Sequence, residues 1–197
     1  MKKNNLNSLP VIDENEELKG IVTISDIIGS YIDVWDNGIL GKSGTSIDNI
    51  IDTLSAKVVI NPNEIKPPMG KLLVLAMEPK SAVGYIEEND IAICGDRKDI
   101  QELAMNSKIS LMIVTGNIEV NEEILKLGEK NGITIISTPH DTFTTARLIT
   151  QSVPISYVMS RDNLVVFTLD DLVDNVKEKM SQTRYRSYPV IDDGNNN

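Results

Sequence analysis

The pattern Ser-x-Pro-Val-Ile-Asp occurs near both ends of this chain, at residues 8–13 and again at residues 187–192. A proline followed by β-branched residues is typical of a short strand, because the proline suits its first position and the branched side chains pack well on a pleated surface. The sequence therefore begins and ends on the same short strand. Any fold for this chain has to accommodate that strand twice, with most of the sequence in between.

The first copy lies in a segment that we predict to run strand, turn, strand and helix. Polar residues 14–17 follow the first strand and predict a turn, and residues 18–24 predict a second strand. Ser25 and Asp26 are typical of a helix start, and apolar residues then continue at roughly helical spacing. Residues 1–35 therefore form one candidate unit.

The composition and the hydrophobic pattern change twice in the middle of the chain. Residues 36–70 are rich in Gly, Asn, Ser and Pro, so we predict a linker region there, with one short helix capped by Ser46. Residues 71–152 instead alternate short apolar runs with segments of helical spacing, which predicts a mostly parallel sheet covered on both faces. The fold class is therefore α/β, with strands expected at 71–77, 90–96, 109–116 and 133–139 and helices at 97–107, 121–132 and 141–152.

The hydrophobic pattern changes again in residues 153–197, after Pro154. A strand is expected at residues 164–167, a helix at residues 169–182 with Thr168 as its cap, and then the second copy of the opening strand. This segment forms the last candidate unit.

Charge and composition exclude several classes of protein. The chain carries 19 Lys and Arg against 29 Asp and Glu, a formal net charge of −10. This balance argues against nucleic-acid binding, which needs a positive surface, although a few local donors can still hold a small anion. Cys94 is the only cysteine, so no internal disulfide is expected. No secretory signal follows Met1 and no apolar run is long enough to cross a bilayer, so we expect a soluble cytoplasmic protein without membrane contact.

Three motifs carry a resemblance to known families. The run from Gly20 to Asp26 matches the Gly-h-h-Thr-x-x-Asp motif of CBS domains, where h is an apolar residue, and residues 158–192 resemble the first half of a second CBS domain. Residues 96–100 keep only the Asp-Arg of the DRTGG signature. The order CBS, DRTGG, CBS resembles the regulatory insert of CBS-containing, manganese-dependent family II inorganic pyrophosphatases. In that resemblance the repeated strand is the same strand of two CBS domains.

The resemblance implies a site for AMP, ADP, ATP or a diadenosine polyphosphate. Physical chemistry supports part of it, because a helix start after a strand offers free N–H groups to a phosphate. Alternatively, Thr23 and Asp26 only cap the helix, Met159 is plain core, and the basic segment near residue 185 is a solvated helix end. The candidate nucleotide-binding residues are Asn7, Gly20, Thr23, Ser25, Asp26, Val158, Met159, Ser160, Arg184, Tyr185 and Arg186.

Catalysis is not expected from this chain by itself. His140 is the only histidine, so neither a metal site with several histidines nor a Ser-His-Asp arrangement is expected. The resemblance places Mn²⁺ in a separate catalytic domain, with no metal or cofactor in this segment beyond the regulatory nucleotide, and it implies a homodimer. Two alternatives stay open: a structural dimerisation module without a ligand, and a small α/β enzyme domain that binds phosphate near Asp96 and Arg97.

Overall fold

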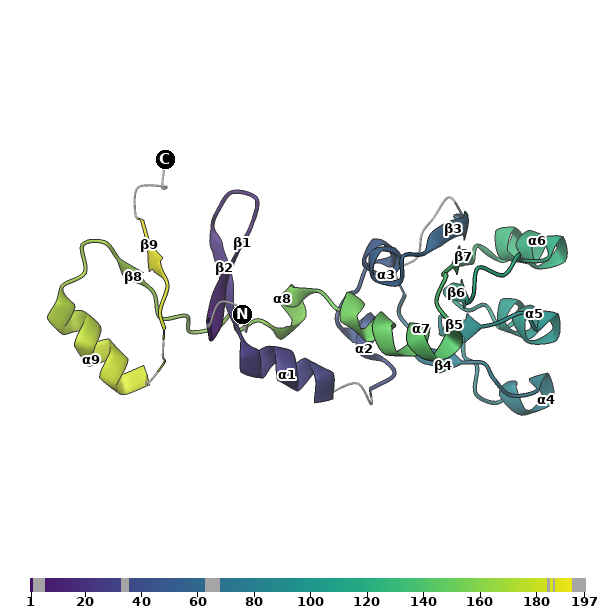
Figure 1. Ribbon diagram of the computed structural model, residues 1–197, viewed down its shortest axis with the longest axis horizontal. Coiled ribbons are helices and arrows are strands. Elements are labelled where there is room, and N and C mark those ends of the chain that lie inside the picture. The colour runs from purple at the N-terminus through teal and green to yellow at the C-terminus, as the bar shows by residue number, and fades with distance from the viewer. Residues whose placement is uncertain (2–5, 33–35, 63–67, 184, 186, 193–197) are drawn as a thin grey trace. The chain divides into compact units, whose positions relative to one another are not determined.

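The computed structural model describes residues 1, 6–32, 36–62, 68–183, 185 and 187–192. The chain divides into two compact units (Figure 1). Unit 1 comprises Met1–Ile32 and Val158–Asn197, and unit 2 comprises Asp33–Tyr157. Among the described residues, no helix is both long enough and apolar enough to span a membrane.

Unit 2 is built on a five-stranded sheet of order β3-β7-β6-β5-β4. Strands β4 to β7 are parallel, and β3 joins β7 antiparallel at one edge. Every residue of β5, β6 and β7 is buried, which explains why these strands are continuous apolar runs rather than alternating ones. The α/β fold with a mostly parallel sheet is thus confirmed, with strands β3 (Lys57–Ile60), β4 (Leu72–Val74), β5 (Ile91–Cys94), β6 (Leu111–Val114) and β7 (Thr134–Ser137).

Helices cover both faces of this sheet (Figure 1). One face packs against α4 (Pro79–Ala82), α5 (Lys98–Asn106) and α6 (Glu122–Asn131). The opposite face packs against α2 (Ile39–Lys42), α3 (Ile47–Leu54), α7 (Thr142–Leu148) and the 3-10 helix η3 (Ile149–Ser152). A short helix, α8 (Ile155–Val158), follows η3 in the chain.

The stretch at residues 36–70, which the composition predicts to be a linker, differs from that expectation. Its described part supplies α2 and α3 to one face of the sheet and β3 to the sheet edge. Ser46 caps α3 as predicted, its side chain accepting a hydrogen bond from the Asn49 N–H at 3.1 Å. Ile50 and Leu54 are fully buried in the core. The Gly and Asn around these elements mark turns between short packed pieces, which composition alone does not separate from a linker.

Unit 1 combines segments from both ends of the chain. The antiparallel hairpin of β1 (Ser8–Ile12) and β2 (Leu18–Thr23) leads directly into α1 (Ile24–Ile32), as predicted. The C-terminal segment forms a parallel pair, β8 (Phe167–Thr168) and β9 (Val190–Ile191), connected by α9 (Val173–Thr183). An isolated antiparallel bridge between Ile21 and Ser160 joins the two segments.

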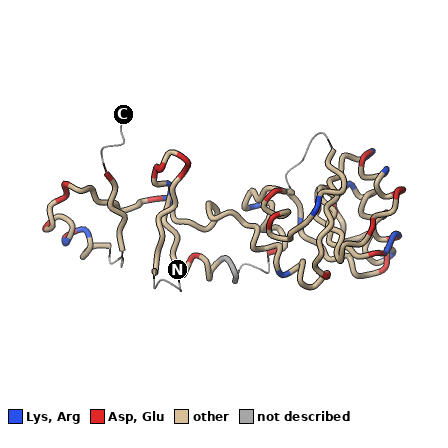
Figure 2. Tube along the Cα trace, turned by 45° about the horizontal axis from the view of Figure 1, so that its top comes forward, with Lys and Arg blue, Asp and Glu red and all other residues tan. Residues whose placement is uncertain are grey.

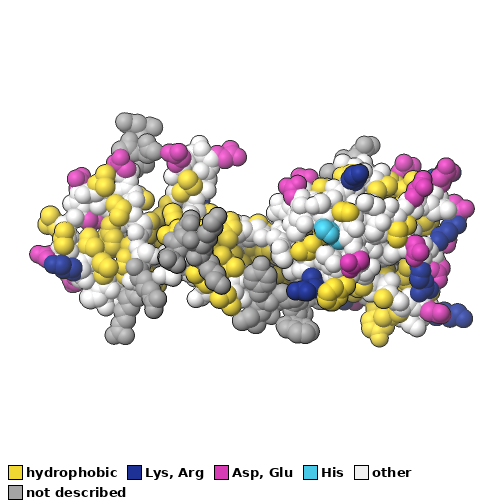
Figure 3. Space-filling model, viewed as in Figure 1, with side chains coloured by type: hydrophobic (Ala, Val, Ile, Leu, Met, Phe, Trp, Pro, Cys, Tyr) yellow, Lys and Arg dark blue, Asp and Glu magenta, His cyan; other side chains and the backbone are white. Residues whose placement is uncertain are grey.

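The start of α9 differs from its sequence-based prediction. The Thr168 N–H donates to the Asp171 carboxylate at 2.8 Å, which is one half of the predicted capping box, but the turn that these residues form precedes the helix. The helix begins at Val173 instead, which leaves Leu169, Leu172 and Val173 about 70% exposed. Figure 3 shows apolar side chains at the surface of this part of unit 1.

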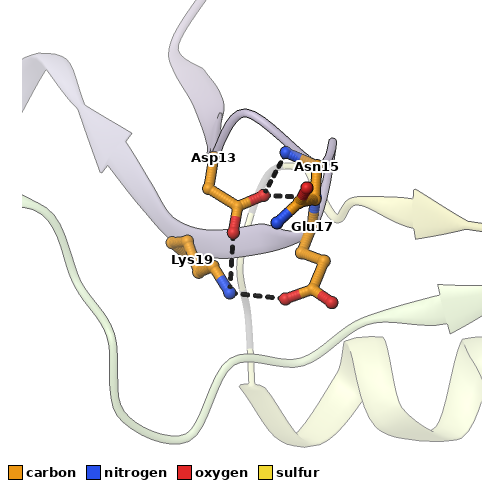
Figure 4. Close-up of polar contacts among 4 residues, drawn as sticks. All are labelled: Asp13, Asn15, Glu17 and Lys19. Atoms are coloured by element: carbon orange, nitrogen blue, oxygen red, sulfur yellow. Dashed lines mark hydrogen bonds and ion pairs between the residues drawn. The ribbon is translucent and has the colours of Figure 1, made fainter.

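The tip of the β1–β2 hairpin is fixed by one carboxylate. Figure 2 marks acidic residues at this tip in red. Asp13 accepts hydrogen bonds from the N–H groups of Asn15 and Glu17 at 3.0 and 2.9 Å, and it pairs with Lys19 at 3.0 Å (Figure 4). Lys19 also contacts Glu17 at 2.6 Å. The Lys19 ammonium, together with the N–H group of Glu17, lowers the pKa of Asp13 below its ordinary value of 3.8.

The contacts of Asp13 predict that the stability of the β1–β2 hairpin depends on pH. Because the pKa of Asp13 is lower in the folded state, its stabilising effect is present above pH 3.8 and is lost as the pH falls through the folded value. Asp13→Ala should therefore reduce hydrogen-exchange protection of the β1–β2 amides at pH 7, and the difference from the wild type should shrink towards pH 3. Glu14→Gln, also at the tip, is the matched control; equal effects of the two variants would contradict this role for Asp13.

A second carboxylate orders the loop that precedes β5. Asp90 is 1% exposed, and its two oxygens accept from the N–H groups of Lys71 and Glu87, each at 2.8 Å. Asp90→Ala leaves two buried donors without an acceptor, so we expect the free energy of unfolding of unit 2 to fall by roughly 2–4 kcal/mol. Urea denaturation followed by circular dichroism measures this loss. Glu88→Ala, at an exposed neighbouring position, should change stability little.

Candidate nucleotide site

Unit 1 contains a cavity of about 590 Å³ between its N-terminal and C-terminal segments. Hydroxyl groups from both segments converge on it, together with two aromatic rings and one carboxylate. The described residues that line it are Asn7, Ser8, Ile21, Thr23, Ile24, Ser25, Ser160, Asp162, Asn163, Leu164, Val165, Tyr185, Ser187 and Tyr188. Of the sequence-predicted candidates, the structure thus brings together Asn7, Thr23, Ser25, Ser160 and Tyr185.

Thr23 and Asp26 form a reciprocal cap at the start of α1. The Thr23 hydroxyl and the Thr23 N–H both donate to Asp26 Oδ2 at 2.7 Å, and the Asp26 N–H donates back to Thr23 Oγ1 at 3.2 Å. The described contacts of Thr23 and Asp26 are therefore those of a helix cap. Asp26 does not line the cavity; it orients Thr23, which does.

This cap decides which groups remain for a ligand. A hydroxyl has a single hydrogen, and that of Thr23 is donated to a carboxylate, so Thr23 offers the cavity only acceptor capacity. Ser25 lies two residues after Thr23 and lines the same cavity. Among the described residues at this helix start, Ser25 is therefore the side chain suited to donate a hydrogen bond to an anion, next to the positive end of the α1 dipole.

Gly20 lies where the two segments of unit 1 approach each other closely. A Cβ at this position would lie 2.7 Å from Met159 Sδ and 2.8 Å from the Ser160 carbonyl oxygen. Beside it, Ile21 and Ser160 exchange two backbone hydrogen bonds, of 3.0 and 2.9 Å. The missing side chain thus makes room for the C-terminal segment to cross β2. Val158 and Met159 are half-buried at this crossing and do not line the cavity.

The aromatic wall is assembled around Tyr188. Its hydroxyl accepts from the Tyr185 N–H at 3.0 Å and lies 2.7 Å from the Thr183 hydroxyl. Its ring centroid is 5.8 Å from that of Tyr185 and 5.3 Å from that of Phe167. Tyr185 is 59% exposed, so one of its ring faces is open to a stacking partner. The candidates Arg184 and Arg186 lie outside the described residues.

Sequence reasoning missed several lining residues. Ser8 and Ser187 are the first residues of the two copies of the repeated pattern, and their hydroxyls form a hydrogen bond although they are 179 positions apart. The repeat is the sequence signal for this contact, because it places the two serines at equivalent positions. No comparable signal marks the loop from Asp162 to Val165, which lines the cavity because of the crossing at Gly20.

Candidate residues in unit 2 are engaged in the fold. Arg97 pairs with Asp99 at 2.8 Å and donates to the Met77 carbonyl oxygen at 3.2 Å. Burial raises the pKa of the Cys94 thiol to about 12. Across the described part of the chain, no group of three or more His, Cys, Asp or Glu side chains is arranged to hold a metal ion.

Comparison with models of known protein families shows which domain families this chain matches. The DRTGG domain model matches residues 49–152, and the CBS domain model matches residues 1–33 and 155–196. The chain therefore belongs to the DRTGG-domain family, with parts of a CBS match on both sides of that domain. The sequence-based resemblance to both domains is confirmed.

Individual relatives narrow the class. A crystal structure of the CBS and DRTGG domains of the regulatory region of Clostridium perfringens pyrophosphatase, complexed with the activator diadenosine tetraphosphate, is similar with a TM-score of 0.90 and 52% identity, over 99% of this chain and 85% of that chain. The cobalt-dependent inorganic pyrophosphatase of Clostridium perfringens (strain 13 / Type A) is 51% identical over 99% of this chain and 36% of its own length. A probable manganese-dependent inorganic pyrophosphatase of Thermotoga maritima is 28% identical over 98% of this chain and 35% of its own length. The chain spans about a third of the length of these curated relatives.

The crossing at Gly20 predicts a sensitive position. Gly20→Ala should separate β2 from residues 158–160, because the new methyl group would overlap both a side chain and a backbone oxygen. We expect a loss of roughly 1–3 kcal/mol in the stability of unit 1. Hydrogen exchange at the Ile21 and Ser160 amides measures it. Gly29→Ala, at a helix position where a Cβ meets nothing within 4 Å, is the control and should be neutral or stabilising.

Proposed function

We propose that unit 1 binds an adenine nucleotide, and that this chain is the regulatory region of an inorganic pyrophosphatase. The observation that carries the proposal is the cavity, in which a helix start, several hydroxyls and two tyrosines converge. Its volume of about 590 Å³ falls within the range of small-molecule sites. The similarity to a regulatory region crystallised with diadenosine tetraphosphate supports an adenine nucleotide as the ligand class.

The chemistry of the lining fits the parts of a nucleotide. The start of α1, with Ser25 as donor, suits a phosphate. Tyr185 offers an open aromatic face for stacking a base, and such stacking tolerates any purine. Hydroxyl groups of Ser8, Ser160 and Ser187 supply donors and acceptors for ribose or phosphate oxygens. AMP, ADP, ATP and a diadenosine polyphosphate all meet this description.

Regulation would follow from differential binding. A nucleotide shifts an enzyme between states only when its affinity for those states differs. In this proposal the chain itself is not catalytic, and the metal named for the relatives, manganese or cobalt, acts in a catalytic domain elsewhere in the longer protein. A cytoplasmic location fits a chain with one free, buried thiol.

A dimerisation role for unit 2 is supported by a separate observation. Val83, Tyr85 and Phe143 are 60%, 63% and 70% exposed, and exposed aromatic and aliphatic side chains of this kind are what the core of a dimer interface covers. A homodimer that covers them would make unit 2 an assembly module beside the nucleotide site. The alternative of a phosphate-binding enzyme domain has less support, because the Arg97 guanidinium already pairs with Asp99 and the Met77 carbonyl oxygen.

Isothermal titration calorimetry with AMP and with diadenosine tetraphosphate tests the nucleotide proposal. We expect saturable binding to the wild-type chain and at least fivefold weaker binding to Ser25→Ala, because one charge-assisted hydrogen bond is worth roughly 1.5–3 kcal/mol at a buried site and less at this exposed one. Asp26→Ala, which releases Thr23 from its cap, should also weaken binding.

Thr144→Val is the matched control. Thr144 donates to Asp141 at the start of α7 in unit 2, a Thr–Asp cap remote in sequence from the cavity-lining residues. This variant should bind nucleotide like the wild type. If the wild-type chain binds neither nucleotide, the proposed function of this region is refuted. Equal losses of affinity in Ser25→Ala and Thr144→Val would show that binding does not depend on the start of α1.

A further inference from the structure

One acidic residue, Asp162, lines the proposed nucleotide cavity at an exposed position. Among the described residues that line this cavity, Asp162 is the only one with a charged side chain. The other described lining residues contribute hydroxyls, amides, aliphatic groups and two aromatic rings. Within this part of the lining, the electrostatic response to an anion therefore depends on two features: the positive end of the α1 dipole and the negative charge of Asp162.

The backbone fixes where this carboxylate lies. Two residues before it, Ser160 exchanges both of its backbone hydrogen bonds with Ile21 of β2. The next residue, Asn163, also lines the cavity and has a φ of 55°, a left-handed conformation that Asn adopts more readily than most residues. Leu164 and Val165 then line the cavity wall and are half-buried. Asp162 thus sits in a short loop held on both sides and not on a mobile terminus.

We propose that Asp162 is a specificity-determining residue that discriminates between ligands by their charge. The inference rests on the proposed nucleotide function and adds its selectivity. A phosphate held near Ser25 is attracted by the helix start and repelled by Asp162, and this repulsion grows with each further phosphate charge placed in the cavity. A neutral nucleoside experiences no such penalty. The carboxylate therefore favours ligands with few charges per nucleoside, and it makes a longer polyphosphate extend away from it.

The charge-neutral variant Asp162→Asn isolates this effect, since it keeps the shape and polarity of the side chain. Titration calorimetry with adenosine, AMP and ATP provides a ligand series of increasing charge. We expect Asp162→Asn to leave the adenosine affinity within error of the wild type, to raise the AMP affinity about threefold and to raise the ATP affinity about tenfold at low salt. At high ionic strength these gains should shrink, because salt screens charges at an open site.

Asp170→Asn is the control, because Asp170 is an exposed carboxylate of the same unit that does not line the cavity. It should raise the affinities for AMP and ATP by less than a factor of 1.5. Equal effects of Asp162→Asn and Asp170→Asn would overturn the proposal, because only the net charge would then matter. A loss of adenosine affinity in Asp162→Asn would overturn it as well, since the carboxylate would then be accepting hydrogen bonds from the nucleoside.

The same experiment separates this inference from the proposed function. A wild-type chain that binds AMP and ATP, with unchanged affinities in Asp162→Asn, refutes charge discrimination and leaves the nucleotide site standing. A wild-type chain that binds none of the three ligands refutes the nucleotide site, and charge discrimination with it.

Discussion

The crossing of the C-terminal segment over β2 is the contact on which unit 1 depends. Two backbone hydrogen bonds between Ile21 and Ser160 join segments that are distant in sequence. Each such bond contributes only about 0.5–1.5 kcal/mol net, so the crossing is stable only where the backbones can approach closely. Gly20 permits that approach, because Met159 and Ser160 occupy the space of its missing side chain. The two walls of the cavity face each other because this contact forms.

The two copies of the repeated strand contribute unequally to the cavity. Their first residues, Ser8 and Ser187, meet through their hydroxyls, as equivalent positions do when two copies pack face to face. One position beyond each serine the copies diverge, since Leu9 stands in the first copy where Tyr188 stands in the second. Only the second copy therefore supplies an aromatic wall. The repeat thus places equivalent serines together, while the difference between Leu9 and Tyr188 leaves the cavity with an aromatic wall on one side only.

How much could be predicted from the sequence depended on the range of the interactions involved. The four strands of residues 71–152 and the helices α5, α6 and α7 were predictable, because continuous apolar runs and amphipathic helices are local patterns, whereas the single turn of α4 was not predicted. The Thr23–Asp26 cap is equally local, and it is one of the two interpretations given for these residues from the sequence. By contrast, β3 consists of only four residues and is defined by pairing with β7, so its surroundings suggested a linker. The roles of Gly20 and Asp162 depend on a contact between distant segments, which no local pattern encodes.

Unit 2 also helps the parts of unit 1 to meet. Its first and last elements pack together: Leu40 and Ile50 share a core cluster with Ile149, and the Asn49 amide donates to the Ser152 carbonyl oxygen at 3.3 Å. Once this core has formed, the chain enters and leaves unit 2 from neighbouring elements. The loop that separates the two segments of unit 1 is then effectively short, which lowers the entropy cost of closing it and raises the effective concentration of each segment for the other. With unit 2 folded, the two backbone hydrogen bonds between Ile21 and Ser160 therefore have a smaller entropy cost of loop closure to offset.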